Sequence, residues 1–262
     1  MPPRSQESTI NFADEHHQKH PLETDDLIEN ALKDFEYKIE QIPAGEKKCL
    51  LDAQCKCPEL LTDDFKLMFL RTDVFQVDLA AKRYVKYWEN RVDLFGVDKA
   101  FLPLNRAGAM MDDQEYHSIG YIRTVPGHER LLIVDPSRGS KKSNIDALTR
   151  SCVVTVQQAL EASEEMQKKG SICILDLGKA TFYHHAFVKR FTEVTNDSFP
   201  LRCSLFCIVN APPGVGFFVK IFKLFLKPRM KNRLYVIKDD AQLQELAGIA
   251  MKDVYPNLDP DK

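Results

Sequence analysis

Residues 205–226, LFCIVNAPPGVGFFVKIFKLFL, are the most informative part of the chain for its architecture. They open with five apolar residues, and then two prolines and a glycine within residues 210–214 prevent a central strand from continuing. These features predict a strand buried on both faces at residues 205–209, a sharp turn, and an apolar helix at residues 215–226. Strands that lead directly into helices are typical of α/β proteins with largely parallel sheets.

The predicted helix at residues 215–226 has more apolar surface than one packing contact can bury. At about 100° per residue, its nine apolar side chains cover an arc of roughly 220°. Four of them are phenylalanines within nine residues, which form a wide lining suited to a lipid tail. Each methylene group buried against such a lining contributes roughly 0.8 kcal/mol. We therefore expect the surplus face to meet a ligand, a partner or a bilayer, and a fully buried core helix with snorkelling lysines is the alternative.

A run of positive charge follows the start of this helix. From Lys220 to Lys238 the chain has seven basic residues and no acidic one. Beside an apolar helix, such a cluster suits the head group of an anionic lipid, because each basic side chain near a charged leaflet adds about 1 kcal/mol of attraction. An ordinary solvated surface is the alternative, since runs of charge are often simply exposed.

Composition limits the class of protein. The chain has 262 residues, enough for one large domain with a small helical lobe, and a net charge of −2, which gives no global attraction to nucleic acid. Seven cysteines, several inside apolar runs, indicate free thiols in a reducing compartment rather than a disulfide framework. We recognise no secretory signal and no apolar stretch long enough to span a bilayer. We therefore expect a cytoplasmic protein that associates peripherally with membranes.

Three further apolar runs predict strands, at residues 131–134, 172–175 and 234–237. A helix of about 24 residues is expected between the first two strands, and a shorter helix is expected before the strand at residues 205–209. This alternation predicts parallel neighbours in one sheet. Residues 1–24 are polar and are expected to form a flexible tail, whereas helical periodicity from residue 25 onward predicts a helical lobe.

Enzyme and metal sites find little support in the sequence. No complete Gly-x-Gly-x-x-Gly or Gly-x-x-x-x-Gly-Lys-Ser/Thr loop occurs, and no Gly-x-Ser-x-Gly elbow occurs. We interpret His184 and His185 as the start of a helix rather than as a base or as ligands. Cys55 and Cys57 lack the two-residue separation of common zinc knuckles. We therefore expect no catalytic residues, no metal and no cofactor other than a bound lipid.

Several short motifs occur in order along the chain. The predicted lobe contains DDFKLMFLRTDVFQVD at residues 63–78. The predicted sheet region contains ILDL at residues 174–177, FYHHAF at 182–187 and DSFPLR at 197–202, which leads into IVNAP at 208–212. In these motifs and their separations, the chain resembles the CRAL-TRIO family of lipid-binding proteins from about Glu46 to Ile237.

The resemblance implies an α/β fold in which an N-terminal helical lobe packs on a lipid-binding domain with a mobile gate helix. Together with the polar tail expected at residues 1–24, this places the lobe at 25–98 and the CRAL-TRIO domain at 100–255, with the gate at 215–226. It further implies that a monomer binds one hydrophobic lipid and transfers it between intracellular membranes. The implied partners are this lipid and a phosphoinositide-containing membrane surface, and no nucleic acid. A protein-interaction or lipid-sensing scaffold of the same fold is the alternative.

The resemblance also assigns residues to two sites. The positions that would bind phosphoinositide head groups are Arg71, Arg202, Arg229 and Arg233. The aligned positions that would line the lipid pocket are Cys173, Phe191, Val194, Phe199, Leu201 and Phe206. The gate helix would add Phe217, Phe218, Ile221, Phe222 and Phe225. In this interpretation the gate opens at an anionic membrane, the lipid tail exchanges through the opening, and the gate closes again.

Overall fold

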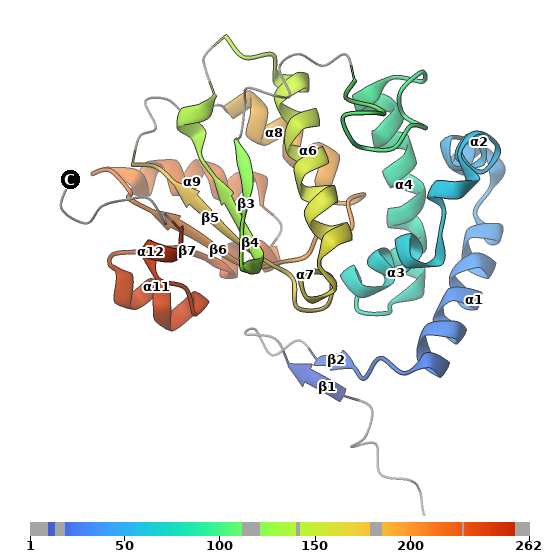
Figure 1. Cartoon of the computed structure of the whole chain (residues 1–262), viewed down its shortest axis with the longest axis horizontal. Coiled ribbons are helices and arrows are strands. Elements are labelled where there is room, and N and C mark those ends of the chain that lie inside the picture. The colour runs from blue at the N-terminus through green and yellow to red at the C-terminus, as the bar shows by residue number, and fades with distance from the viewer. Residues whose placement is uncertain are drawn as a thin grey trace, which may run out of the picture.

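A five-stranded sheet of order β3-β4-β5-β6-β7 forms the centre of the molecule (Figure 1). This computed structural model describes residues 10–13, 19–111, 121–139, 142–178, 185–226 and 228–254. The five strands span Ile122–Val125, His128–Val134, Ser171–Asp176, Cys203–Val209 and Leu234–Val236. β4, β5, β6 and β7 are parallel neighbours, so the four apolar runs of the sequence all form strands of one sheet. The α/β prediction is therefore confirmed.

The edge strand β3 was not among the predicted strands. It pairs antiparallel with β4, and the pairing of Val125 with His128 leaves Pro126 and Gly127 as a two-residue hairpin turn. Gly127 has a φ of 80°, a conformation that glycine adopts without the steric cost of a side chain. The strand is only four residues long and includes an arginine and a threonine, so its apolar signal is weak.

Seven helices in the described part of the chain connect or follow the strands of the sheet. α6 (Ile145–Ala162) and α7 (Glu164–Lys169) join β4 to β5, and α8 (His185–Thr195) precedes β6. α9 (Val215–Phe225) and α10 (Pro228–Asn232) join β6 to β7, and α11 (Asp240–Ala247) follows β7, with the single turn of α12 (Met251–Val254) after it. The long helix predicted before β5 is thus two helices. The break lies at Ser163, whose hydroxyl accepts a hydrogen bond from the Met166 amide at 3.0 Å and caps α7.

Alternate residues of the central strands face two different cores. One face packs against Leu243 and Ile249 of the C-terminal region, and its strand residues are Leu131, Ile133, Ile172, Ile174, Leu205 and Cys207. The other face includes Leu132 and Cys173 and packs with residues of α6 and α8. This alternation follows from the two-residue repeat of a strand. The two faces of the sheet therefore belong to two separate apolar cores.

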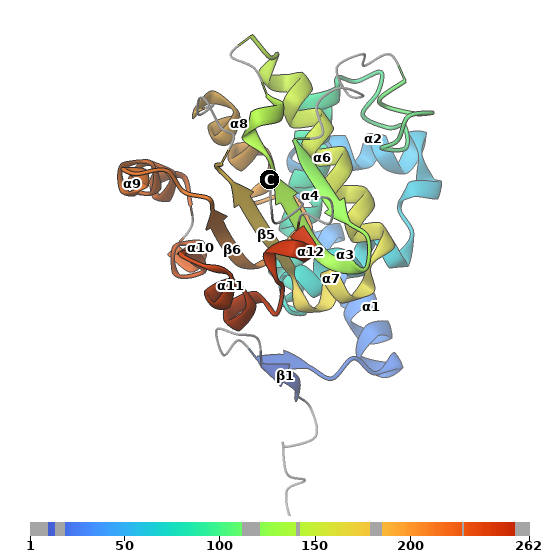
Figure 2. The same cartoon turned by 60° about the vertical axis from the view of Figure 1, so that its left-hand side comes forward.

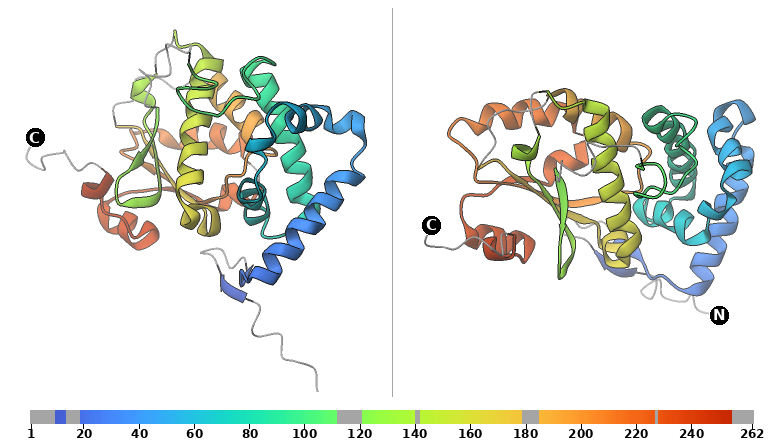
Figure 3. Two further views of the ribbon diagram at one scale, coloured as in Figure 1. Left: turned by 45° about the vertical axis from the view of Figure 1, so that its right-hand side comes forward. Right: turned by 45° about the horizontal axis from the view of Figure 1, so that its top comes forward.

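Four helices form the N-terminal lobe, which lies on the opposite side of the molecule from α11 and α12 (Figure 3). They are α1 (Asp25–Gln41), α2 (Lys48–Lys56), α3 (Asp63–Thr72) and α4 (Val77–Phe95), with short 3₁₀ turns at Ala44–Lys47 and Pro58–Leu60. The hydroxyls of Thr24 and Thr62 accept hydrogen bonds from amides in the first turns of α1 and α3, both at 3.2 Å. Gly96, with a φ of 76°, ends α4.

Aromatic side chains dominate the core of this lobe. Phe69, Tyr84 and Trp88 are each exposed by 1% or less. The ring centroids of Phe69 and Tyr84 are 5.0 Å apart in an edge-to-face arrangement. The same apolar cluster continues into the sheet region, where it includes Leu132 and Cys173. The lobe and one face of the sheet therefore share a continuous core.

Two short strands lie in the segment that the sequence predicted as a flexible tail. β1 (Ile10–Ala13) and β2 (Lys19–Pro21) pair antiparallel with each other near the ends of α1 and α7 (Figure 1). Polar contacts hold β2 and the segment that follows it. Nη1 of Arg202 lies 2.6 Å from Nε2 of the buried His20, and Glu23 accepts from Arg71 at 2.8 Å. These partners are distant in sequence, so local composition does not reveal them.

Candidate functional site

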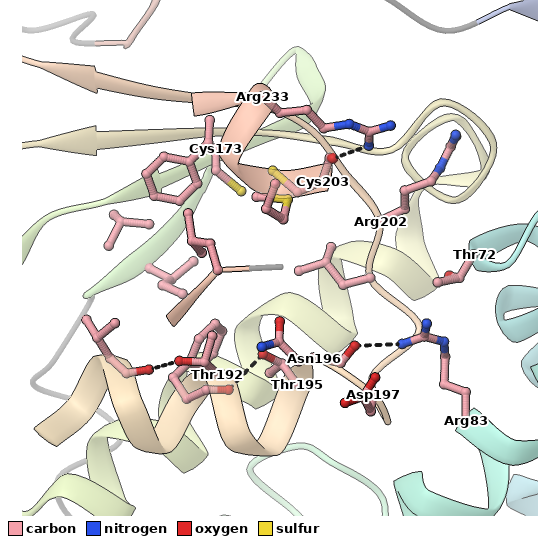
Figure 4. A pocket seen from close by; sticks show the side chains of 18 of the residues that line it. Thr72, Arg83, Cys173, Thr192, Thr195, Asn196, Asp197, Arg202, Cys203 and Arg233 are labelled. Atoms are coloured by element: carbon pink, nitrogen blue, oxygen red, sulfur yellow. Dashed lines mark hydrogen bonds between the residues drawn. The ribbon is translucent and has the colours of Figure 1, made fainter. Parts of the chain in front are cut away.

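A cavity of about 600 Å³ lies against the face of the sheet that carries Cys173. Its walls come from β4, β5, β6, α8 and the start of α4, and residues after α9 complete it. Figure 4 shows Thr192 and Thr195 of α8 on one side of this space and Cys173 and Cys203 of the strands on the other. The cavity therefore lies where the lobe meets the sheet domain.

The wall formed by the sheet is apolar. Val134 of β4, Leu175 of β5 and Phe206 of β6 line it, and all three lie on the same face of neighbouring strands as Cys173. On the other side, Phe187, Val188 and Phe191 of α8 complete the lining. Such a lining can hold an apolar chain without specific polar contacts.

The end of the cavity near the lobe is polar. Asp73 and Arg83 form an ion pair at 2.7 Å, and both side chains are largely buried. Arg83 also donates to the backbone carbonyls of Asn196 and Phe199, each at 3.2 Å. These bonds attach α4 of the lobe to the segment after α8 (Figure 4). The rim is therefore held by bonds between two parts of the chain that are far apart in sequence.

Two of the predicted head-group arginines, Arg202 and Arg233, line this cavity and are buried, with exposures of 8% and 6%. Nη2 of Arg202 donates to the carbonyl of Lys168. Nη1 of Arg233 donates to the carbonyl of Cys203 at 2.6 Å. Both guanidinium groups are thus oriented by backbone carbonyls at the ends of neighbouring elements. Figure 4 shows the bond that Arg233 makes.

Arg71 lies apart from this cavity. Its guanidinium forms ion pairs with Glu23 at 2.8 Å and Glu164 at 2.7 Å, and it donates to Gln167 at 2.6 Å. The side chain is 8% exposed and borders a small separate cavity beside His20. The structure therefore places Arg71 in a network that joins α3, α7 and the N-terminal segment, whereas the resemblance had grouped it with Arg202 and Arg233.

The predicted pocket residues fall into three groups. Cys173, Phe191, Leu201 and Phe206 line the large cavity. Val194 and Phe199 do not line it; they are buried and border a much smaller space of about 10 Å³. Both pack into the shared core, because their side chains point from the end of α8 and the segment after it toward Tyr87 and Leu94 of the lobe. The third group comprises the gate side chains, which lie outside the described part of the structure: Phe217, Phe218, Ile221, Phe222 and Phe225. The side chain of Arg229, a predicted head-group residue, also lies outside it.

The helix that the resemblance identified as the gate is present as α9. In Figure 2 it lies at the rim of the sheet domain, on the side away from α1 and α2. Val215 and Val219 pack against Leu175 and Ile208 at the end of the sheet, whereas Leu224 is 76% exposed. Leu226 and Met230, which follow the helix, line the cavity. The chain after α9 is therefore part of the cavity wall.

The sequence interpretation missed the contribution of α4 to the cavity. Leu79, Lys82, Arg83 and Lys86 all line it. Their spacing of three and four residues places them on one face of a helix, which is a signal that the sequence contains. That signal is weak on its own, because a charged helical face is normally interpreted as solvent-exposed.

Among the residues that the structure describes, no group of three or more His, Cys, Asp or Glu side chains is placed to hold a metal ion. Within the same residues, no helix combines the length and the hydropathy needed to cross a membrane.

Comparison with known proteins identifies the family. The CRAL/TRIO domain family matches residues 111–254. The alpha-tocopherol transfer protein-like proteins of Mus musculus and Homo sapiens are 27% and 26% identical to this chain over 231 residues. Each match covers 83% of this chain and 65% of the relative, so the chain spans about two thirds of the length of these relatives.

A solved structure has the same fold. The crystal structure of Sfh5 matches with a TM-score of 0.53 and 14% sequence identity, over 86% of this chain and 85% of that chain. The family match covers more than half of the chain and includes β3 to β7. The resemblance noted in the sequence motifs is confirmed: this chain belongs to the CRAL/TRIO domain family.

Proposed function

We propose that this protein binds one hydrophobic lipid in the cavity beside β5, β6 and α8 and transfers it between membranes. The observation that carries the proposal is a cavity of about 600 Å³, whose apolar wall includes Leu175 and Phe206. Sites for small apolar ligands typically have volumes of roughly 300–1,000 Å³ and only a few polar groups. The family supports the same conclusion, because CRAL/TRIO proteins typically bind lipids, and two relatives are named for tocopherol transfer.

Apolar burial alone provides enough affinity for such a carrier. A chain that buries about ten methylene groups gains roughly 8 kcal/mol, which corresponds to a dissociation constant of about 1 μM. The polar rim formed by Asp73, Arg83 and Asn196 then suits a head group rather than more of the tail. No covalent step is required for binding or release.

Membrane docking is the second part of the proposal. Arg202 and Arg233 line the cavity and are fixed by backbone carbonyls, an arrangement that suits a phosphate-rich head group such as that of a phosphoinositide. The exposed Leu224 of α9 provides an apolar contact for the bilayer on the same part of the molecule. In this proposal α9 moves aside at the membrane, the tail exchanges, and the protein remains only peripherally associated.

Lipid occupancy tests the first part. The purified protein is incubated with vesicles of mixed lipid composition, isolated again, and extracted for mass spectrometry. We expect one class of hydrophobic lipid at one molecule per chain, because the cavity has room for a single chain or ring system. A protein that returns from the vesicles without stoichiometric lipid would instead be a scaffold of the same fold.

Transfer kinetics test the docking arginines. We expect Arg202→Gln and Arg233→Gln each to slow transfer to phosphoinositide vesicles by about fivefold, since each basic side chain near the leaflet contributes about 1 kcal/mol. Glutamine is shorter than arginine and loses contacts such as that between Arg202 and His20, so lipid occupancy and the thermal midpoint are measured for each variant and transfer is expressed per molecule of lipid-loaded protein. Lys189→Gln is the matched control, because Lys189 is an exposed cation on α8. Transfer rates that are equal for the wild type and both arginine variants would disprove the docking role.

A further inference from the structure

The exposed residues of the cavity lining mark where the lipid cavity opens to water. Leu79 is 49% exposed, and Lys82, Lys86 and Asp197 are exposed as well, although all four line the cavity. Leu175 of β5, which lines the cavity too, is buried. An opening of the cavity therefore lies between α4 of the lobe and the segment that follows α8.

Two lysines of α4 place positive charge at this opening. Lys82 and Lys86 are four residues apart, so their side chains lie on the same face of the helix. Asp78, one turn before Lys82, forms an ion pair with Lys38 at 2.8 Å. Within the described residues, no ion pair holds either lysine of the opening. Like charges at this spacing destabilise a helix, so the pair is unfavourable until an anion binds beside it.

The other charges of the lining leave this positive excess in place. Arg83, which follows Lys82, forms an ion pair with Asp73 at 2.7 Å, and the two charges neutralise each other. Asp197 is at the same end of the cavity as Arg83 (Figure 4). Among the described lining residues, five side chains are cationic and only two are carboxylates, although the whole chain has a net charge of −2. The lining therefore differs in sign from the chain as a whole.

We propose that the lipid carried by this protein has an anionic head group, a carboxylate or a phosphate, which Lys82 and Lys86 hold at the opening of the cavity. The inference rests on the proposed lipid-binding function, and it names the class of lipid. The apolar tail extends toward Leu175 and Phe206. The head group stays at the exposed opening, where it remains partly hydrated and avoids the large cost of burying a charge. A neutral lipid with the same tail gains nothing from the two lysines.

The exposure of the lysines sets the size of the expected effect. An ion pair between exposed groups is weak, so each lysine should strengthen the binding of an anion by about threefold. The two lysines together should then favour an anionic lipid over a neutral one by about tenfold. Most of the affinity still comes from burial of the tail. The lysines therefore select among lipids with similar tails and do not decide whether a lipid binds.

Three lipids with the same oleyl chain test the proposal: oleic acid, oleyl phosphate and oleyl alcohol. Each displaces a neutral fluorescent acyl probe from the full chain at mildly alkaline pH, where both anionic head groups are ionised. We expect at least one anion to bind about tenfold more tightly than the alcohol, and its identity distinguishes a carboxylate from a phosphate. The preference should shrink at high salt, because exposed charges are screened. Equal affinities for all three lipids would overturn the proposal.

A double variant locates the preference. Lys82→Gln combined with Lys86→Gln should weaken binding of the preferred anion by about tenfold and leave the affinity for oleyl alcohol unchanged. The matched control combines Lys33→Gln with Lys189→Gln, which changes the net charge equally at exposed lysines that do not line the cavity. The control should keep the full preference. A preference that survives in the Lys82/Lys86 variant would contradict the proposal, because the head group would then lie elsewhere.

The same measurements separate this inference from the proposed function. If the alcohol and both anions bind with the same affinity, the cavity holds lipid and only the anionic class is wrong. If neither the probe nor any of the three lipids binds, the cavity does not accept an apolar chain and both proposals fail.

Discussion

Thr192→Trp is expected to weaken lipid binding by roughly 200-fold. Thr192 lies on α8 and lines the cavity, where Figure 4 shows it opposite the strand wall. An indole at this position would occupy the space of about four methylene groups of a bound chain, and each lost methylene contact costs roughly 0.8 kcal/mol. The measurement is displacement of a fluorescent fatty acyl probe, together with extraction of the lipid that remains after vesicle incubation.

Lys189→Trp is the matched control for this substitution. Lys189 lies on the same helix, its side chain is 64% exposed, and its contact with Glu193 is a weak surface pair at 3.9 Å. A tryptophan there should leave affinity unchanged, because it does not enter the cavity. Wild-type affinity in Thr192→Trp would show that lipid binds elsewhere, and the cavity would lose its proposed role.

Phe69→Ala is expected to destabilise the protein by about 3–5 kcal/mol. Phe69 is completely buried in the lobe, and its ring lies 5.3 Å from that of Phe65 and 5.5 Å from that of Tyr87. Truncation removes apolar contacts and edge-to-face ring interactions, and it leaves a cavity that close-packed neighbours cannot fill. Urea unfolding followed by circular dichroism measures the loss, and the thermal midpoint should fall by about 10 °C.

Tyr37→Ala is the comparison for this core substitution. Tyr37 is an aromatic residue of α1 with 58% exposure, so its loss should change the free energy of unfolding by less than about 0.5 kcal/mol. Because the lobe and the sheet share a core that includes Cys173, Phe69→Ala should also lower lipid occupancy. A loss of stability below about 1 kcal/mol would mean that the aromatic cluster is loosely packed.

The strands could be predicted because their causes are local, and the helix ends of the structure have equally local causes. Continuous apolar runs such as residues 205–209 are required wherever a strand is covered on both faces. A threonine before an acidic first turn, as at Thr24 and Thr62, provides a cap with its own backbone. A glycine with positive φ, as at Gly96, marks where a helix must end. Each of these signals depends on residues within a few positions of one another.

The contacts that the sequence did not reveal join distant residues. Arg71 was grouped with the head-group arginines because its position in a motif fitted, but its partners Glu23 and Glu164 lie 48 and 93 residues away. Val194 and Phe199 are apolar, as pocket residues would be, yet only the packing of α8 against the lobe decides which apolar side chains face the cavity. Pattern gives the character of a side chain, whereas three-dimensional packing gives its neighbours.

The division of the sheet into two faces has a consequence for how cargo preference can diverge. A change at Leu175 or Phe206 alters the space offered to the lipid, whereas Ile174 and Cys207, one residue away along each strand, support the packing beneath α11. Adjacent codons therefore control separate properties. A lineage, or a directed-evolution library limited to the cavity-facing positions, can change what is carried while the opposite side continues to hold the domain together.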